Sequence, residues 1–413
     1  MRRALPMVLA VLAGSACKRA ETVGAPAADV VPAAPADAPT VEAASVGPGP
    51  GLAATEGDPR EELTNRTYDV LLDGTIAYRA TTAGVVVEDL SQPETPRRLA
   101  VAVLPGSVNR LALLGDVPRP PAPGCSAPAD GGAGDACSDG PPRRVLAAAA
   151  GPLGVVLFDV HDPARPVELS RFDTPGAAMG LAASYPDLYV ADGTNGVLAL
   201  DVRDPERPRA AAAADGPSTD RAASDASAPP YVRDVLLDGT RLFAAAGPAG
   251  LLLYEVRSPS GAGGGPSLTL RAVIDTPGDA RAVAVDGATA YVADGAAGLQ
   301  IVDTSSAGPK AVPGIAATWA TRDICRDVKV AVGRDRTLFP PTAYLALGDR
   351  GLEVLEITDA QAPKVRGRHE APRPVNRVTL GPNGLVLLAN DSAGLRVLDV
   401  ADPAAIRVVF PRP

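Results

Sequence analysis

The sequence predicts an all-β fold, a seven-bladed β-propeller of four-stranded antiparallel blades, and three observations lead to this prediction. A short motif typified by "GLQIVD" recurs seven times in the 413 residues. Successive copies lie 42 to 54 residues apart, except for one gap of 70 residues. Aromatic residues make up only 3%, whereas Ala, Val, Leu, Gly and Pro are abundant, as in many short strands packed by small side chains. A period in this range, with about four short strands per unit, is typical of propeller blades.

The N-terminal residues 1–16 predict a lipoprotein-type signal peptide. Two arginines precede an apolar run from Ala4 to Ala13, which is too short to span a bilayer permanently. The small residues before Cys17 resemble a bacterial lipoprotein signal, in which the cysteine is lipidated and becomes the mature N-terminus. The alternative is ordinary signal cleavage, with Cys17 incidental. Both interpretations predict export.

Composition indicates three further segments of the chain. Residues 17–60 are rich in Ala and Pro and lack periodicity, so they predict a disordered, flexible tether between lipid and domain. The propeller is expected over 61–413, with a Gly, Pro and Asp-rich insertion at about 116–143 in the second blade. Cys125 and Cys137 both lie in this insertion, and we expect them to form a disulfide that closes a short loop in an oxidising compartment.

Each repeat is expected to hold four strands, as the fifth unit shows. Its strands are predicted at 281–287, 289–295, 298–303 and 310–318, the first lining the channel and the last at the rim. Asp-Gly after the first two strands supplies the positive φ that tight turns require. A "DP..P" turn often follows the third strand, where Pro suits the entry to an edge strand. Such a sheet has two apolar faces and must stack between neighbours. The last unit supplies its own outer strand, so ring closure need not borrow residues 60–67, although that segment remains a possible extra strand.

Every motif carries a carboxylate five residues after its glycine. We interpret these side chains as structural, because a residue repeated at a strand end most simply accepts hydrogen bonds from turn amides. The seven are Asp89, Asp159, Asp201, Glu255, Asp303, Glu356 and Asp399.

On these motifs the chain resembles the LVIVD-repeat β-propellers of exported bacterial proteins, whose repeats read like "YVADGAAGLQIVDTS". The resemblance covers about residues 65–413. The first and fourth units carry "RATTAG" and "AAAGPAG" in place of the Asp-Gly turn. What the resemblance implies about activity is modest, since members are mostly uncharacterised surface or periplasmic proteins. The single tryptophan, Trp319, argues against WD40 repeats and quinoprotein propellers.

Catalytic, metal and cofactor sites are not predicted. The two histidines, His161 and His369, have no plausible carboxylate and nucleophile partners by sequence. No spacing of acidic residues matches an EF-hand loop. Cys325 is expected to be a buried free thiol. A net charge of −9 without a basic run beyond the N-terminus argues against nucleic acid.

One polar set could bind a ligand, because the starts of the inner strands face the channel, where loops of all blades converge. Arg233, Arg281 and Arg326 come from three consecutive blades and are expected on one side of the entrance, opposite Asp69. The plainer interpretation, favoured from sequence alone, is a solvated ring in which Asp234 and Asp327 neutralise the adjacent arginines. The candidate mouth residues are Asp69, Arg110, Arg233, Asp234, Arg281, Arg326, Asp327 and Arg377.

The sequence thus predicts a non-enzymatic cell-envelope lipoprotein whose propeller presents a binding surface for a protein or an anionic glycan or peptide. Its membrane contact is expected through the lipid on Cys17 alone, on a periplasmic or cell-surface face. Two alternatives stay open. One is a propeller hydrolase or lyase, similar to lactonase-type propellers, with an active site at the channel mouth. The other is a purely structural envelope protein.

Overall fold

The structure, a computed structural model, describes residues 66–119, 142–214, 230–257, 266–305, 313–333 and 340–411. Within these ranges, 28 strands form seven four-stranded antiparallel sheets, and each sheet uses four consecutive strands. The predicted all-β propeller with seven blades is confirmed. The expected signal peptide, the tether with Cys17, and most of the insertion with Cys125 and Cys137 lie outside the described residues.

The first four blades run from the N-terminal side of the described chain. Blade 1 contains β1 (Thr67–Asp73), β2 (Ile76–Thr81), β3 (Gly84–Asp89) and β4 (Arg97–Val103). Blade 2 contains β5 (Arg110–Val117), β6 (Arg143–Ala149), β7 (Val155–Asp159) and β8 (Val167–Phe172). Blade 3 contains β9 (Gly180–Ser184), β10 (Asp187–Ala191), β11 (Val197–Asp201) and β12 (Arg209–Ala214). Blade 4 contains β13 (Asp234–Asp238), β14 (Arg241–Ala245), β15 (Leu251–Arg257) and β16 (Ser267–Ile274).

The last three blades complete the ring. Blade 5 contains β17 (Ala282–Asp286), β18 (Thr289–Ala293), β19 (Leu299–Asp303) and β20 (Gly314–Trp319). Blade 6 contains β21 (Asp327–Ala331), β22 (Thr342–Ala346), β23 (Leu352–Glu356) and β24 (Lys364–His369). Blade 7 contains β25 (Arg377–Leu380), β26 (Leu385–Ala389), β27 (Leu395–Asp399) and β28 (Arg407–Phe410), with 3-10 turns η2 (Pro382–Gly384) and η3 (Pro403–Ala405).

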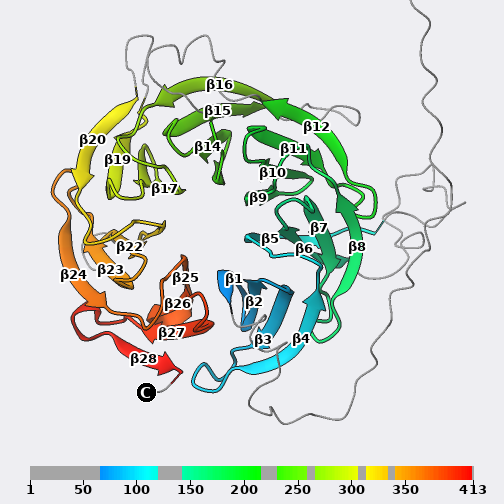
Figure 1. Cartoon of the computed structure of the whole chain (residues 1–413), viewed down its shortest axis with the longest axis horizontal. Helices are drawn as coiled ribbons and strands as arrows, with labels where there is room; N and C mark the ends of the chain where they lie inside the picture. Colours follow the sequence, from blue (N-terminus) through cyan, green and yellow to red (C-terminus); the bar gives the residue numbers. More distant parts are fainter. Residues whose placement is uncertain are drawn as a thin grey trace, which may run out of the picture. The chain divides into compact units, whose positions relative to one another are not determined.

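The blades close into a ring in which the first strand of each blade lies innermost and the fourth lies at the rim (Figure 1). The inner strands of consecutive blades contact one another, and β25 contacts β1. The Thr67 amide donates to the Asp391 carbonyl over 2.9 Å, and the Thr379 hydroxyl donates to the Val70 carbonyl over 2.5 Å. Blade 7 takes all its strands from the C-terminal end, as expected, and Thr67 belongs to β1 of blade 1.

Neighbouring blades are also joined through the tight turn that follows the second strand. Gly295 in this turn has φ of 60° and pairs with Cys325 of blade 6 by two backbone hydrogen bonds. Positive φ favours glycine, which explains the Asp-Gly of the repeat. The same bridge joins other blades at Gly151–Ala178, Gly193–Val232, Gly247–Ala280 and Gly348–Val375.

The hydrophobic core consists of seven clusters, one between each pair of adjacent blades. Between blades 4 and 5, for example, Phe243 and Leu251 pack against Val283 and Val292. Val, Leu and Ala supply most of these side chains. A blade therefore buries its faces only against its neighbours, and the ring is the smallest unit that covers every apolar face.

The anchor glycine of the repeat has a steric role. At Gly154, φ is +72° and an added Cβ would lie 2.1 Å from the Phe172 carbonyl oxygen, far inside contact distance. Similar contacts surround Gly84, Gly250, Gly298 and Gly351. Glycine is therefore required where the third strand begins against the end of the fourth.

The recurring carboxylates serve the turns, and the structural interpretation is confirmed for the five aspartates. Asp89 accepts the Ser91 amide over 2.8 Å, and this hydrogen bond lowers the pKa of Asp89. Asp159, Asp201, Asp303 and Asp399 accept the equivalent amide. The expectation is wrong for the two glutamates. The longer side chains of Glu255 and Glu356 instead accept from arginines of their own blades, Glu255 from Arg271 and Glu356 from Arg366.

Candidate binding site at the channel mouth

The channel entrance is lined by the residue that precedes the inner strand in each blade. Its amide donates to the last carbonyl of the second strand in six blades, as Arg281 does to Ala293 over 2.8 Å. Tyr68 holds this place in blade 1, directly after Thr67. One such residue comes from each blade, and we call the seven the mouth ring: Tyr68, Asn109, Met179, Arg233, Arg281, Arg326 and Asn376. Together with Arg377, the mouth ring surrounds a hollow of about 170 Å³.

Blades 4, 5 and 6 make one half of the mouth ring cationic. Arg233 Nε lies 3.2 Å from Asp279 Oδ1, and Arg281 Nη2 lies 2.7 Å from Asp279 Oδ2, so two guanidiniums share one carboxylate. Arg233 also lies over the Tyr231 ring, 5.0 Å from its centre. The convergence of the arginines of blades 4 and 5 therefore leaves an excess of positive charge.

Arg326 continues the cationic half into blade 6. Its Nη1 donates to Asn376 Oδ1 over 3.1 Å, which is a neutral partner. The Nε atoms of Arg281 and Arg326 are buried and have no hydrogen-bond partner within the described chain. A buried donor without a partner costs free energy, so these two side chains are not fully satisfied within the described chain.

Blades 7, 1, 2 and 3 make the other half of the mouth ring neutral. Asn376 Nδ2 donates to the Thr67 carbonyl over 3.1 Å. Asn109 Nδ2 donates to the Ala178 carbonyl over 3.2 Å and lies 3.5 Å from Met179 Sδ. The two asparagines thus tie their own blades to the next ones, while Tyr68 and Met179 add apolar surface to the same hollow.

Beneath the mouth, a second set of side chains crosses the channel as a buried ion network. Arg110 Nη2 lies 2.7 Å from both carboxylate oxygens of Asp234, and Arg110 Nη1 lies 3.8 Å from Asp69. Arg377 Nη1 lies 3.0 Å from Asp327 and 3.4 Å from Asp234. This network, defined by these five residues, links blades 1, 2, 4, 6 and 7.

Backbone amides complete the network. Asp69 accepts the Leu111 amide of blade 2, and Asp327 accepts the Val378 amide of blade 7. Both hydrogen bonds are 3.0 Å long. At the same strand position blades 3 and 5 carry Gly180 and Ala282. At Gly180 an added Cβ would lie 2.8 Å from the Arg233 carbonyl oxygen, so glycine lets the inner strands of blades 3 and 4 approach closely.

The charges of the network stabilise one another despite burial. Burial opposes the charge of Arg110, but Asp234, Asp69 and Asp327 outweigh it and raise the pKa of Arg110. Burial likewise opposes ionisation of Asp327, but Arg377, Lys329 and Arg110 outweigh it and lower the pKa of Asp327. The network therefore keeps its charges in the folded state.

The eight predicted residues thus lie at two levels. Arg233, Arg281 and Arg326 lie in the mouth ring, on one side as expected, and Arg377 lines the hollow from below. The other four belong to the buried network: Asp69, Arg110, Asp234 and Asp327.

Two expectations about the pairing of these residues are wrong. Asp69 does not face the arginines across the entrance, and Asp234 and Asp327 do not neutralise Arg233 and Arg326, since their ion pairs go to Arg110 and Arg377. The reason is that successive residues of an extended chain point in opposite directions.

Sequence reasoning missed the neutral half of the mouth ring and the carboxylate Asp279. A signal was available for the neutral half, because Asn109, Met179 and Asn376 directly precede inner strands and Tyr68 lies at the start of β1. Shifting the repeat alignment by one position identifies Tyr68, Asn109, Met179 and Asn376.

The two histidines and Cys325 do not line the hollow at the mouth. His369 lies in β24, with its Nε2 3.3 Å from Arg396 Nη1, and His161 lies in the turn after β7. Cys325 is buried and free, as predicted, and burial raises the pKa of its thiol. Across the described ranges, no cluster of three or more His, Cys, Asp or Glu side chains is suited to a metal ion.

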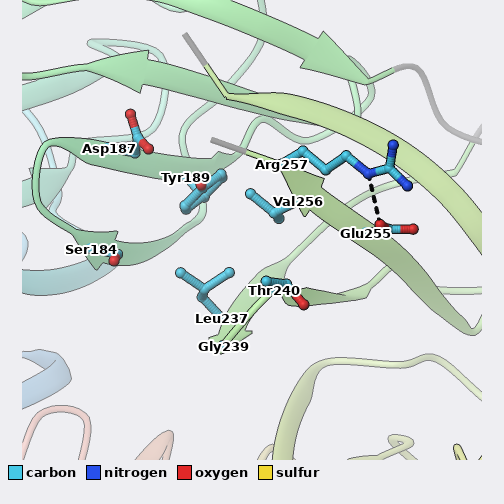
Figure 2. A pocket seen from close by; sticks show the side chains of 9 residues that line it. All are labelled: Ser184, Asp187, Tyr189, Leu237, Gly239, Thr240, Glu255, Val256 and Arg257. Atoms are coloured by element: carbon cyan, nitrogen blue, oxygen red, sulfur yellow. Dashed lines mark hydrogen bonds and ion pairs between the residues drawn. The ribbon is translucent and has the colours of Figure 1, made fainter. Parts of the chain in front are cut away.

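A second hollow, of about 500 Å³, lies between blades 3 and 4 (Figure 2). Tyr189, Leu237 and Val256 form its apolar part, and Arg257 Nε donates to Glu255 over 2.8 Å at one side. Because Glu255 also accepts from Arg271, its charge is compensated within the fold. This hollow supports a charged ligand less well than the mouth does.

The fold and the mouth ring define a seven-bladed β-propeller with a partly cationic channel entrance. Within that class the chain carries LVIVD repeats, because the LVIVD repeat family matches residues 175–211 in blade 3 and 277–308 in blade 5. The resemblance seen in the motifs is thus confirmed. No curated protein matches the sequence.

Solved structures share the architecture. The chain is similar to U3-55K, with a TM-score of 0.54 and 10% identity, over 79% of this chain and 88% of that chain. It is also similar to the computationally designed Ika8 protein, with a TM-score of 0.49 and 9% identity, over 81% of this chain and 96% of that chain. At these identities the likeness to U3-55K shows the fold alone.

Proposed function

We propose that the protein is a non-enzymatic binding protein of the cell envelope, whose channel mouth holds an anionic group of a protein or glycan partner. One observation carries this proposal. Arg233, Arg281 and Arg326 line one hollow, and the single carboxylate Asp279 pairs with Arg233 and Arg281, while Arg326 donates to the neutral Asn376. Guanidiniums bind carboxylates and other oxyanions by charge-assisted, often bidentate hydrogen bonds.

The buried network supports a binding role. Arg377 lines the hollow and pairs with Asp234, which also pairs with Arg110, so the entrance lies on a fixed set of charges. Propeller ligands bind at such entrances, where residues from every blade meet on a rigid scaffold.

Attachment to the envelope is the second part of the proposal and rests on the sequence of residues 1–60. Lipidation of Cys17 would hold the propeller at a membrane through the tether, since several acyl chains on one cysteine give stable anchoring. In the part of the chain with described structure, no helix is long and apolar enough to cross a membrane. Mass spectrometry of the mature N-terminus tests this part, and an unmodified N-terminus beginning after another residue contradicts it.

The mouth is tested with two triple variants of the tagged full chain. One replaces Arg233, Arg281 and Arg326 by Ala. The matched control replaces three exposed arginines away from the mouth, Arg98, Arg165 and Arg209, by Ala and changes the net charge equally. Each protein is incubated with envelope extract, and retained proteins and glycans are identified.

We expect a partner that the wild type and the control retain and that the mouth variant loses. All three proteins should have similar melting temperatures, because partly exposed side chains contribute little to stability. Equal retention by a folded mouth variant would show that the mouth is only a hydrated ring, and the proposal would then fail.

A further inference from the structure

The mouth ring is divided into two chemically different halves, and this division narrows the class of ligand that the proposed function requires. The cationic half comes from blades 4 to 6 and the neutral half from blades 7 and 1 to 3. A ligand that fills the hollow therefore places an anionic group on one side and an uncharged, partly apolar group on the other.

The size of the hollow limits how much of a ligand can enter. Its volume is about 170 Å³, and Arg377 of the buried network lines it together with the mouth ring. The hollow therefore accommodates about one residue of a ligand.

The charge balance favours an anionic ligand. Asp279 already offsets one of the three mouth guanidiniums, and the floor residue Arg377 is paired with Asp327 and Asp234. Arg281 and Arg326 line the hollow, so a carboxylate can accept from their guanidinium N–H groups. The two charges that Asp279 leaves uncompensated attract a carboxylate or a phosphate alike.

The neutral half offers the groups that recognise a peptide end. Asn109 uses its Nδ2 atom on the Ala178 carbonyl, and its Oδ1 atom has no partner among the described residues. This oxygen can accept a ligand N–H. Met179 beside it is flexible and adapts to apolar groups of different shape, and Tyr68 adds a flat surface.

From these features we infer that the mouth binds the C-terminal residue of a peptide or protein. The terminal carboxylate lies against Arg281 and Arg326, the last peptide N–H donates to Asn109, and the last side chain contacts Met179 and Tyr68. This inference rests on the proposed function and names the ligand of the same site. A glycan ending in a uronic acid shares the carboxylate but lacks the amide N–H in this position.

The test uses the purified full chain and a set of N-acetylated tripeptides, Ac-Gly-Gly-X, with X varied over Leu, Phe, Ala and Glu. Each peptide is titrated calorimetrically with a free carboxylate and with a C-terminal amide. A third form of the best peptide carries an N-methyl group on its last peptide nitrogen. The double variant Arg281→Gln with Arg326→Gln is compared with the control Arg98→Gln with Arg165→Gln.

We expect the free acid to bind about tenfold or more tightly than the amide, because hydrogen bonds to a charged group are lost. The mouth double variant should remove this preference, and the control should keep it. N-methylation should weaken binding of the peptide to the wild type. It should have little further effect on binding to the Asn109→Ala variant.

Several results overturn the inference. Equal affinity for acid and amide does so, as does failure of every peptide to bind. If an oligosaccharide ending in glucuronic acid, or inorganic phosphate, binds in an arginine-dependent way where the peptides fail, the proposed function survives and the peptide assignment falls. If the mouth variant also retains every partner of the wild type from envelope extract, both fail.

Discussion

Arg110 and Asp234 form an ion pair across the channel, with Arg110 Nη2 2.7 Å from both carboxylate oxygens, although 124 residues separate them in the chain. They come from blades 2 and 4, and blade 3 lies between these two blades in the ring (Figure 1). The pair is the centre of a network that holds five of the seven blades at the axis.

Replacing Asp234 by Ala should destabilise the fold by about 3–5 kcal/mol, because Arg110 and Arg377 would keep buried charges without this carboxylate. Urea unfolding of the full chain measures the change. Glu94→Ala, at an exposed position of blade 1, is the control and should change stability by less than about 0.5 kcal/mol. A loss for Asp234→Ala as small as that of the control would contradict the role assigned to the network.

The repeat glycines should differ in tolerance according to their surroundings. Gly154→Ala places a Cβ 2.1 Å from a backbone oxygen at positive φ, and we expect a loss of about 3 kcal/mol or more. Gly239, with φ of +60° and open space around it, is the matched control. Its replacement by Ala should cost about 1–2 kcal/mol from backbone strain alone. Equal losses in urea unfolding would show that the close contact is not what requires glycine.

Asp192→Asn should stabilise the protein at neutral pH. Asp192 is buried, and burial raises the pKa of its carboxyl group, so ionisation is less favourable in the folded state. The amide oxygen can still accept the Gly176 amide, which lies 2.8 Å from Oδ2, and blade 7 naturally carries Asn390 in this turn. We expect Tm to rise by about 1–2 °C at pH 7.

The gain from Asp192→Asn should depend on pH with a definite sign. Because the folded pKa is raised, the wild type loses stability as pH rises above the unfolded value of 3.8, and the variant does not. The difference in Tm between the two proteins should therefore shrink as the pH falls toward 4. A difference that grows on acidification would show that burial of the ionised Asp192 carboxylate is not the source of the gain.

His369 should titrate below its ordinary pKa of 6.5, because burial and the charge of Arg396 both lower that pKa. Its contribution to stability is then complete above about pH 6.5 and decreases as the pH falls through the folded pKa. NMR titration measures the midpoint, and His161→Gln leaves His369 as the single histidine signal. Arg396→Gln should move the midpoint upward. A midpoint at or above 6.5 in the wild type would show that Arg396 does not act on this ring.

The sequence by itself determined the blades, because each repeat contains its own turn signals, its anchor glycine and its alternating apolar strands. Local rules govern these features, so the strands at 282–286, 289–293 and 299–303 lie where the fifth repeat predicted them. The aspartates at the ends of the third strands likewise bond to amides two residues away, a contact that neighbouring residues decide.

Only the tertiary structure decided which channel residues meet. Asp234 directly follows Arg233 in the chain, yet it pairs with Arg110 and Arg377, 124 and 143 residues away. The physical reason is that two successive residues at a strand start point in opposite directions and so reach different levels of the channel. The closed ring then sets the distances between blades. The mouth ring and the buried network below it therefore exist only once all seven blades have closed.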